Sequence, residues 1–146
     1  MYETYIPVIS KKMPDKEKKS LAVQLKRANP DIVYLVYMRQ IHTNIEKSIN
    51  FFTDNKNYLE ENGFEVGVWF APTIGYGGYD VDDKNFYQRI VDMDGKKINA
   101  YCPLDDNFCD DLAKQFKLLA KTGVKHILLE DDFTLSGGKL WVERMG

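Results

Sequence analysis

The chain has 146 residues, of which 44% are hydrophobic, and a net charge of -2 from 20 basic and 22 acidic residues. This composition excludes a disordered chain, and the interspersed charges give no basic surface for nucleic acid. The longest apolar runs, such as residues 32–38, are far shorter than the roughly 20 residues of a membrane helix, and no secretory signal opens the sequence. We expect a single cytoplasmic domain over residues 1–146, with Cys102 and Cys109 as free thiols.

The first predicted helix opens at Pro14 and Asp15 and ends before Asn29 and Pro30. Residues 32–38, "IVYLVYM", are apolar at every position and rich in β-branched and aromatic side chains. Such a run is typical of a parallel strand that is covered on both faces. We predict a strand there.

A second helix is predicted over residues 44–61, because Ile45, Ile49 and Phe52 recur at helical spacing. Asn62 and Gly63 form its C-terminal stop. The next stretch, "FEVGVWFAP", is a second strand with two apolar faces, and it runs into the turn-rich segment 72–83. Loops of that length are commonly functional.

Residues 87–103 alternate apolar and polar side chains around Asp94 and Gly95, which predicts a hairpin with a type I′ turn. A third helix should begin at Asp105 or Asp106 and end at Gly123. The run 126–129 then predicts a third buried strand, with Ile127 and Leu129 packed against helices.

Strands that alternate with helices in this way are joined by right-handed crossovers, so they should run parallel. In a barrel the strands follow one another in chain order, which places the second strand between the first and the third. Ligands bind at the carboxyl edge of such sheets. The candidate site residues that follow the strands to this edge are Arg39, His42, Trp69, Tyr76, Tyr79, Glu130, Asp131 and Asp132.

Three stretches, "NGFEVGVWFAPTIGYGG", "DMDGKKINAYCPLDDNF" and "GVKHILLEDDFTLS", occur in this order along the chain. In order and spacing the chain resembles the N-terminal part of bacterial (β/α)8-barrel proteins of the glycoside hydrolase type. The resemblance implies a TIM-barrel fold with a carbohydrate site at its carboxyl edge. Because a closed barrel takes about 250 residues, 146 residues supply an incomplete barrel of about three β/α units plus the inserted hairpin.

Hydrolysis of a glycoside requires one carboxyl group as acid and a second as base or nucleophile. In an extended continuation of the strand, Glu130 and Asp132 point to one face and Asp131 to the other. Alternatively, Asp131 and Asp132 cap a turn while Glu130 is solvated. A divalent metal is a third interpretation, but three consecutive acids lack the spread of ligands that such a site needs, so we expect no metal and no cofactor.

The flat faces and polar rims of Trp69, Tyr76 and Tyr79 suit a sugar, although Trp69 alternates with neighbours that belong to the core. Arg39 is a candidate for an anionic group and His42 for a substrate hydroxyl, or each has only local partners. The chain alone is expected to lack part of the active site. The alternative function is a noncatalytic α/β domain that binds a partner, or itself, through open sheet edges.

Overall fold

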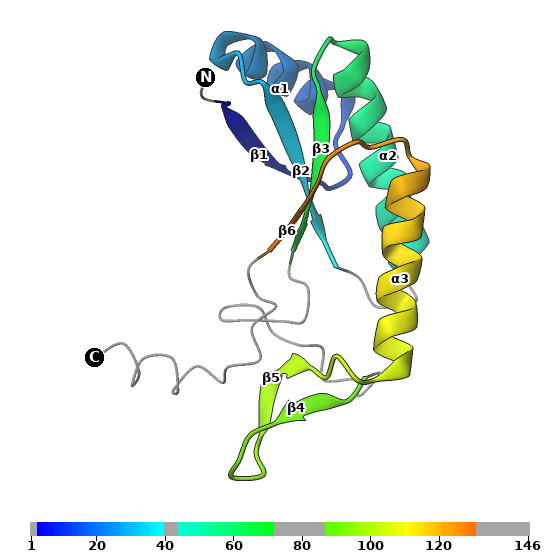
Figure 1. Cartoon of the computed structure of the whole chain (residues 1–146). Helices are drawn as coiled ribbons and strands as arrows, with labels where there is room; N and C mark the ends of the chain where they lie inside the picture. Colours follow the sequence, from blue (N-terminus) through cyan, green and yellow to red (C-terminus); the bar gives the residue numbers. More distant parts are fainter. Residues whose placement is uncertain (1–2, 40–43, 72–86, 131–146) are drawn as a thin grey trace, which may run out of the picture.

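The computed structural model describes residues 3–39, 44–71 and 87–130, and it has a mixed α/β fold (Figure 1). A parallel sheet of four strands packs against three helices, and a small antiparallel sheet lies beside the start of the third helix. The α/β class and the parallel strands are confirmed. The described strands form an open sheet, and no closed barrel is seen among them. The elements are β1 (Tyr5–Ile9), α1 (Asp15–Ala28), β2 (Ile32–Met38), α2 (Ile45–Glu61), β3 (Val66–Ala71), β4 (Arg89–Val91), β5 (Lys97–Tyr101), α3 (Asp106–Lys121) and β6 (Ile127–Leu129).

The three predicted strands of the parallel sheet are adjacent in the order β2, β3, β6. Val36 pairs with Trp69, and Trp69 pairs with Leu128. The predicted position of the second strand between the first and the third is therefore confirmed. A fourth strand, β1, was not predicted; it lies on the outer side of β2, where Ile9 pairs with Val36. The order of the strands in the sheet is thus their order in the chain.

One face of the sheet packs against the helices and forms the core. Leu35 and Val68 on this face are fully buried, as is Phe52 of α2. Burial of each such side chain stabilises the fold by roughly 1.5–3 kcal/mol. The Tyr37 hydroxyl, also in this layer, donates a hydrogen bond to the side-chain oxygen of buried Gln115, 3.2 Å away. Burial raises the pKa of Tyr37 above its ordinary value.

The opposite face of the sheet carries mostly side chains that are half buried or exposed, with Ile32 and Ala71 buried near its two ends, and we call it the open face. Tyr5 is 55% exposed, and its ring meets the Tyr34 ring edge-on at a centroid distance of 5.7 Å. The Tyr34 ring covers Gly67, where a Cβ atom would lie 2.5 Å from Cε1 of the ring. Trp69 follows on this face of β3 and is half buried. The buried residues of the three helices belong to the other face.

The outer edge of β1 contains a proline. Ser10 N–H donates to the Val36 carbonyl, and Ile32 N–H donates to the Thr4 carbonyl. Because residues alternate in direction along a strand, the odd-numbered residues of β1 point their backbone groups away from β2. Pro7 falls in this outward set, where its missing N–H breaks no bond of the ladder, as is typical of an edge strand.

The outer edge of β6 has no such feature. The His126 carbonyl and the Glu130 N–H bond to β3, so Ile127 and Leu129 direct their backbone groups outward. Both side chains lie on the helix side of the sheet, in register with buried residues of β3. They are nevertheless 42% and 48% exposed. The predicted packing of these two residues against helices is wrong, because α3 covers β3 and leaves the outermost strand bare in the described part of the chain.

The helices begin and end close to the predicted positions. Asn29 ends α1 in the left-handed conformation, with φ 51°, and its N–H donates to the Leu25 carbonyl. Asp105 begins α3, because one carboxylate oxygen accepts a bond from Phe108 N–H at 2.9 Å. Its other oxygen accepts from Gln88 N–H at 2.7 Å. The same carboxylate therefore fixes the start of α3 and the first residues of the hairpin.

The predicted hairpin is formed by β4 and β5, with Arg89 opposite Tyr101. Its predicted turn type is wrong. Gly95 has φ 80°, but Asp94 does not have a positive φ, which a type I′ turn requires at both residues. The Asp92 carboxylate instead accepts bonds from the N–H groups of Asp94 and Lys96, at 3.0 and 2.8 Å, and the strand register shifts beside this turn.

Candidate functional site

The carboxyl ends of β2, β3 and β6 lie together at one edge of the sheet (Figure 1). Arg39 N–H donates to the Ala71 carbonyl at 2.9 Å, and Glu130 N–H donates to the Phe70 carbonyl at 3.1 Å. The residues that follow β2 and β6 are thus both held against the end of β3. Of the predicted site residues, Arg39, Trp69 and Glu130 belong to the described part of the chain. The others, His42, Tyr76, Tyr79, Asp131 and Asp132, lie outside the described residues.

Trp69 and Glu130 are in direct contact at this edge. Trp69 pairs with Leu128, and Glu130 lies two residues further on, on the same face of the sheet. The indole Nε1–H donates a hydrogen bond to Oε2 of Glu130 at 3.1 Å. The carboxylate is therefore held on the open face, beside an aromatic ring that is half buried. This contact joins two of the residues that the sequence proposes for the site.

Arg39 lies on the hairpin side of the same edge. Its guanidinium carbon is 4.6 Å from the centre of the Tyr101 ring and 5.6 Å from that of Phe108. Such cation–π contacts stabilise by about 0.5–2 kcal/mol, depending on exposure. The position of Arg39 is thus fixed by aromatic rings of β5 and α3 as well as by the end of β2.

These two rings belong to a small aromatic cluster that sequence reasoning missed. Tyr87 packs edge-on against Tyr101 and Phe108, with centroids 4.9 and 5.5 Å apart, and its hydroxyl bonds to the Asp111 carboxylate. The only sequence signal was the recurrence of aromatic residues on both sides of the hairpin and at the first turn of α3. The cluster attaches the hairpin to the carboxyl edge of the sheet.

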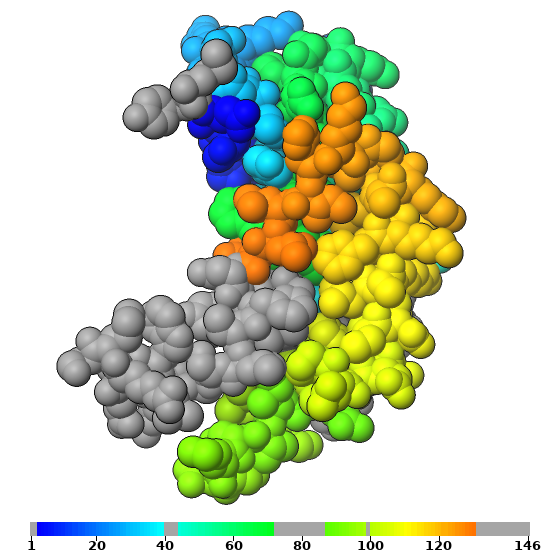
Figure 2. Space-filling view, viewed as in Figure 1, coloured from blue at the N-terminus to red at the C-terminus, as the bar shows by residue number. Residues whose placement is uncertain are grey.

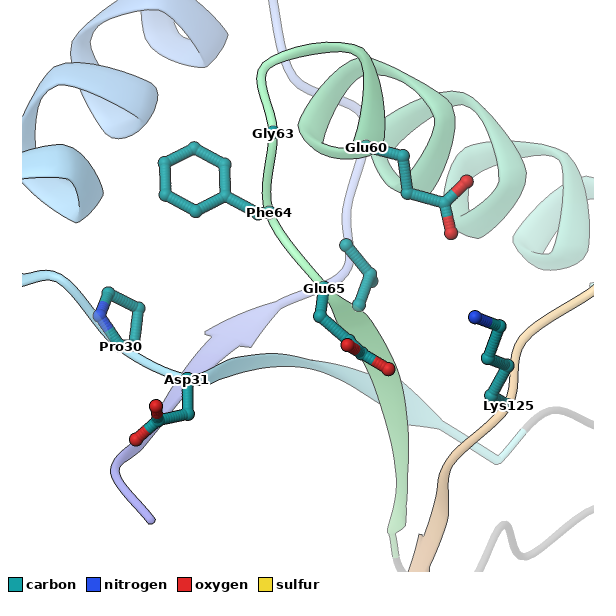
Figure 3. A pocket seen from close by; sticks show the side chains of 8 residues that line it. Pro30, Asp31, Glu60, Gly63, Phe64, Glu65 and Lys125 are labelled. Atoms are coloured by element: carbon teal, nitrogen blue, oxygen red, sulfur yellow. The ribbon is translucent and has the colours of Figure 1, made fainter.

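A hollow of about 510 Å³ opens at the opposite edge, where the strands begin (Figure 3). The carboxylates around it already have partners: Asp31 accepts bonds from Thr4 N–H and Oγ1, and Glu60 pairs with Lys56 at 2.8 Å. The bonds from Thr4 lower the pKa of Asp31. The residues lining the hollow are Pro30, Asp31, Glu60, Gly63, Phe64, Glu65, Val66 and Lys125.

His126 also belongs to this edge, although its place inside an apolar run favours a core histidine with local hydrogen-bond partners. Its side chain is 38% exposed, and Nε2 lies 2.8 Å from Oε1 of Glu65. The hydrogen bond with His126 lowers the pKa of Glu65. The carboxylates of the hollow are thus hydrogen-bonded to other protein groups. The hollow also lies at the amino edge of the strands, where parallel sheets seldom bind a ligand. We therefore do not assign a ligand to it.

Within residues 3–39, 44–71 and 87–130, no three His, Cys, Asp or Glu side chains are grouped so as to hold a metal ion. Cys102 and Cys109 are free thiols, as predicted. Among the helices of these ranges, none combines the length and the apolar character needed to cross a bilayer. Comparisons with family models, curated proteins and solved structures give no match to this chain.

Proposed function

We propose that the chain forms part of a carbohydrate-binding (β/α)8 barrel of the glycoside hydrolase type, with its site at the carboxyl edge of the sheet. The observation that carries this proposal is the hydrogen bond of 3.1 Å between Trp69 Nε1 and Glu130 Oε2 at that edge. Parallel strands in chain order, with helices on one face, further support a sheet of the barrel type.

The paired residues have complementary chemistry toward a sugar. An indole ring offers a flat apolar face to the C–H groups of a pyranose, and a carboxylate accepts hydrogen bonds from its hydroxyls. The hydrogen bond from Trp69 holds one oxygen of Glu130 in place. The orientation of the other oxygen is therefore also fixed, and this oxygen can accept a hydrogen bond from a substrate hydroxyl. Arg39, held at the same edge by Tyr101, is proposed as a further polar contact.

In the proposed chemistry Glu130 is one of the two carboxylates of a glycosidase, and Asp131 or Asp132 is the candidate for the second. Two such groups must stand about 5–9.5 Å apart across the scissile bond. Hydrolysis depends on both, and on strands beyond the four described here. We therefore expect a single copy of the 146-residue chain to bind a sugar without hydrolysing aryl glycosides at ordinary enzymatic rates.

Binding is the decisive measurement. We would titrate the protein with a panel of mono- and oligosaccharides, follow the indole N–H signal of Trp69 by NMR in the wild type, and measure the affinities of all variants by isothermal titration calorimetry. Trp69→Phe and Glu130→Gln should each weaken binding by about tenfold or more, which corresponds to about 1.4 kcal/mol.

The matched control is Glu60→Gln, which changes an acid at the opposite edge of the sheet and should leave sugar binding unchanged. The proposal fails if no sugar shifts the Trp69 signal, or if all three variants weaken binding equally. The cytoplasmic location and the absence of a cofactor remain predictions.

A noncatalytic role in binding a partner is the second candidate function. It is favoured by the exposure of all three side chains of β6, Ile127, Leu128 and Leu129, at 41–48%. Single exposed apolar residues are common, but a whole exposed apolar strand at a sheet edge favours docking.

A further inference from the structure

The sheet has two free edges in the described part of the chain, and these edges are complementary. β1 forms one edge and β6 the other, and the two strands run in the same direction. Along the outer edge of β6, Ile127 and Leu129 offer both N–H and carbonyl groups. Along the outer edge of β1, Tyr5 and Ile9 offer both, whereas Pro7 offers only its carbonyl. The outward backbone N–H and carbonyl groups of one edge can therefore form hydrogen bonds with those of the other edge in a parallel ladder.

Side chains at both edges are also exposed. Ile9 and Tyr5 on β1 are 57% and 55% exposed, and Leu128 on β6 is 41% exposed. By register, Ile9 and Leu128 lie on the open face in the same row as Val36 and Trp69. Figure 2 shows β1 in blue and β6 in orange at the surface of the molecule, while α3 in yellow lies to one side. An apolar row therefore crosses the open face from one edge to the other.

We propose that two copies of the chain join around a two-fold axis parallel to the strands, so that β6 of each copy pairs with β1 of the other. A two-fold rotation about such an axis keeps every strand parallel and creates both junctions at once. Four strands from each copy make eight, the number at which a parallel barrel closes around an interior filled by side chains. The open face becomes that interior, with the helices outside.

This inference rests on the proposed function, because it names the partner that completes the barrel. The same rotation brings a second Glu130, with its own Trp69, to the carboxyl mouth. The dimer thus supplies the second carboxylate that glycoside hydrolysis requires. A second copy explains three features together: the bare edge of β6, the exposed side chains of β1 and the apolar open face.

The mass of the full chain in solution tests this inference. We expect a species of twice 17.0 kDa by sedimentation equilibrium, with no larger species, because a closed ring of two copies leaves no free edge. Leu129→Lys on β6 and Tyr5→Lys on β1 should each raise the dissociation constant by about tenfold or more. Leu104→Lys is the matched control, because Leu104 is an 87% exposed residue outside the parallel sheet.

Other outcomes overturn the inference in distinct ways. A monomer at about 100 μM, a concentration at which an obligate dimer stays assembled, excludes the dimer. Sensitivity to Leu129→Lys alone indicates that β6 pairs with β6, and larger oligomers indicate open-ended pairing. Leu129→Pro is a second variant of β6 and should also weaken the dimer. It removes an N–H group that points outward, but it removes no hydrogen bond to β3. A monomer that still binds sugar through Trp69 leaves the proposed function intact while the dimer is rejected.

Discussion

The ring of Tyr34 lies over Gly67, so close that a Cβ atom at residue 67 would stand 2.5 Å from Cε1 of the ring. Gly67→Ala should displace this ring and lower the free energy of unfolding by about 1–3 kcal/mol, as overpacking commonly does. Urea denaturation followed by circular dichroism measures the loss.

A double-mutant cycle identifies the cause of that loss. In a Tyr34→Ala background the ring is gone, so Gly67→Ala should cost clearly less, and the remaining cost reflects the Cβ atom of His126, 3.1 Å from the added methyl group. An equal cost in both backgrounds would show that the contact with Tyr34 is not responsible.

Tyr37→Phe should lower the free energy of unfolding by about 1–2 kcal/mol, because it removes the hydroxyl that donates a hydrogen bond to the side-chain oxygen of buried Gln115. Burial raises the pKa of Tyr37 in the folded chain, while the unfolded chain ionises near pH 10. The stability linked to the neutral phenol is therefore complete below pH 10 and declines as the pH rises further. Denaturation at pH 9 to 11 should show a weaker decline in Tyr37→Phe than in the wild type. An equally steep decline in Tyr37→Phe and in the wild type would contradict the assignment.

Asp31→Asn tests the carboxylate that holds Thr4 against the start of β2. The pKa of Asp31 is lowered in the folded chain by the bonds from Thr4, so ionised Asp31 favours folding. Its contribution is present above the unfolded pKa of about 3.9 and is lost as the pH falls through the lower, folded value. The wild type should therefore exceed Asp31→Asn in denaturation midpoint at pH 7, and the difference should shrink below pH 4. Asp110→Asn, on α3, serves as a control, and a difference that does not depend on pH would contradict the assignment.

Asp105→Ala should lower the free energy of unfolding by about 1–2 kcal/mol, because it removes the cap of α3 and the bond to Gln88 at once. Hydrogen exchange should speed up at the amides of Phe108 and Gln88. Asp106→Ala changes the adjacent acid and should have little effect on either amide. Asp105→Asn retains an acceptor for Phe108 and should recover part of the loss.

The helices and central strands were predictable because their apolar residues recur at clear periods. Residues 32–38 and the helix from Ile45 fulfil those patterns closely. β1 was missed because it is short and contains Pro7, which weighs against a strand unless the edge position is known. The turn at Asp94 was mistaken because the Asp92 side chain, and not the Asp-Gly pair alone, determines its geometry.

The sequence predicted where in the sheet the candidate site lies, but not which of its side chains are in contact. Parallel strands bring Arg39, Trp69 and Glu130 to one edge, and that follows from topology. The bond between Trp69 and Glu130 depends on the register of β3 against β6, which no local pattern specifies. The contact of Arg39 with Tyr101 depends on how the hairpin packs, across 62 residues of sequence, and had no signal in periodicity.

The agreement between sheet order and chain order has a consequence for synthesis on the ribosome. As β2, β3 and β6 emerge in turn, each finds its partner strand already made, so among the described strands of the parallel sheet only β1 waits for a segment that is translated later. The nascent chain can therefore grow its sheet vectorially, one strand and its helix at a time. The newest strand always carries a free edge that the next strand will cover, so this part of the aggregation hazard moves along the chain during translation, while the edge of β1 stays free and is interrupted by Pro7.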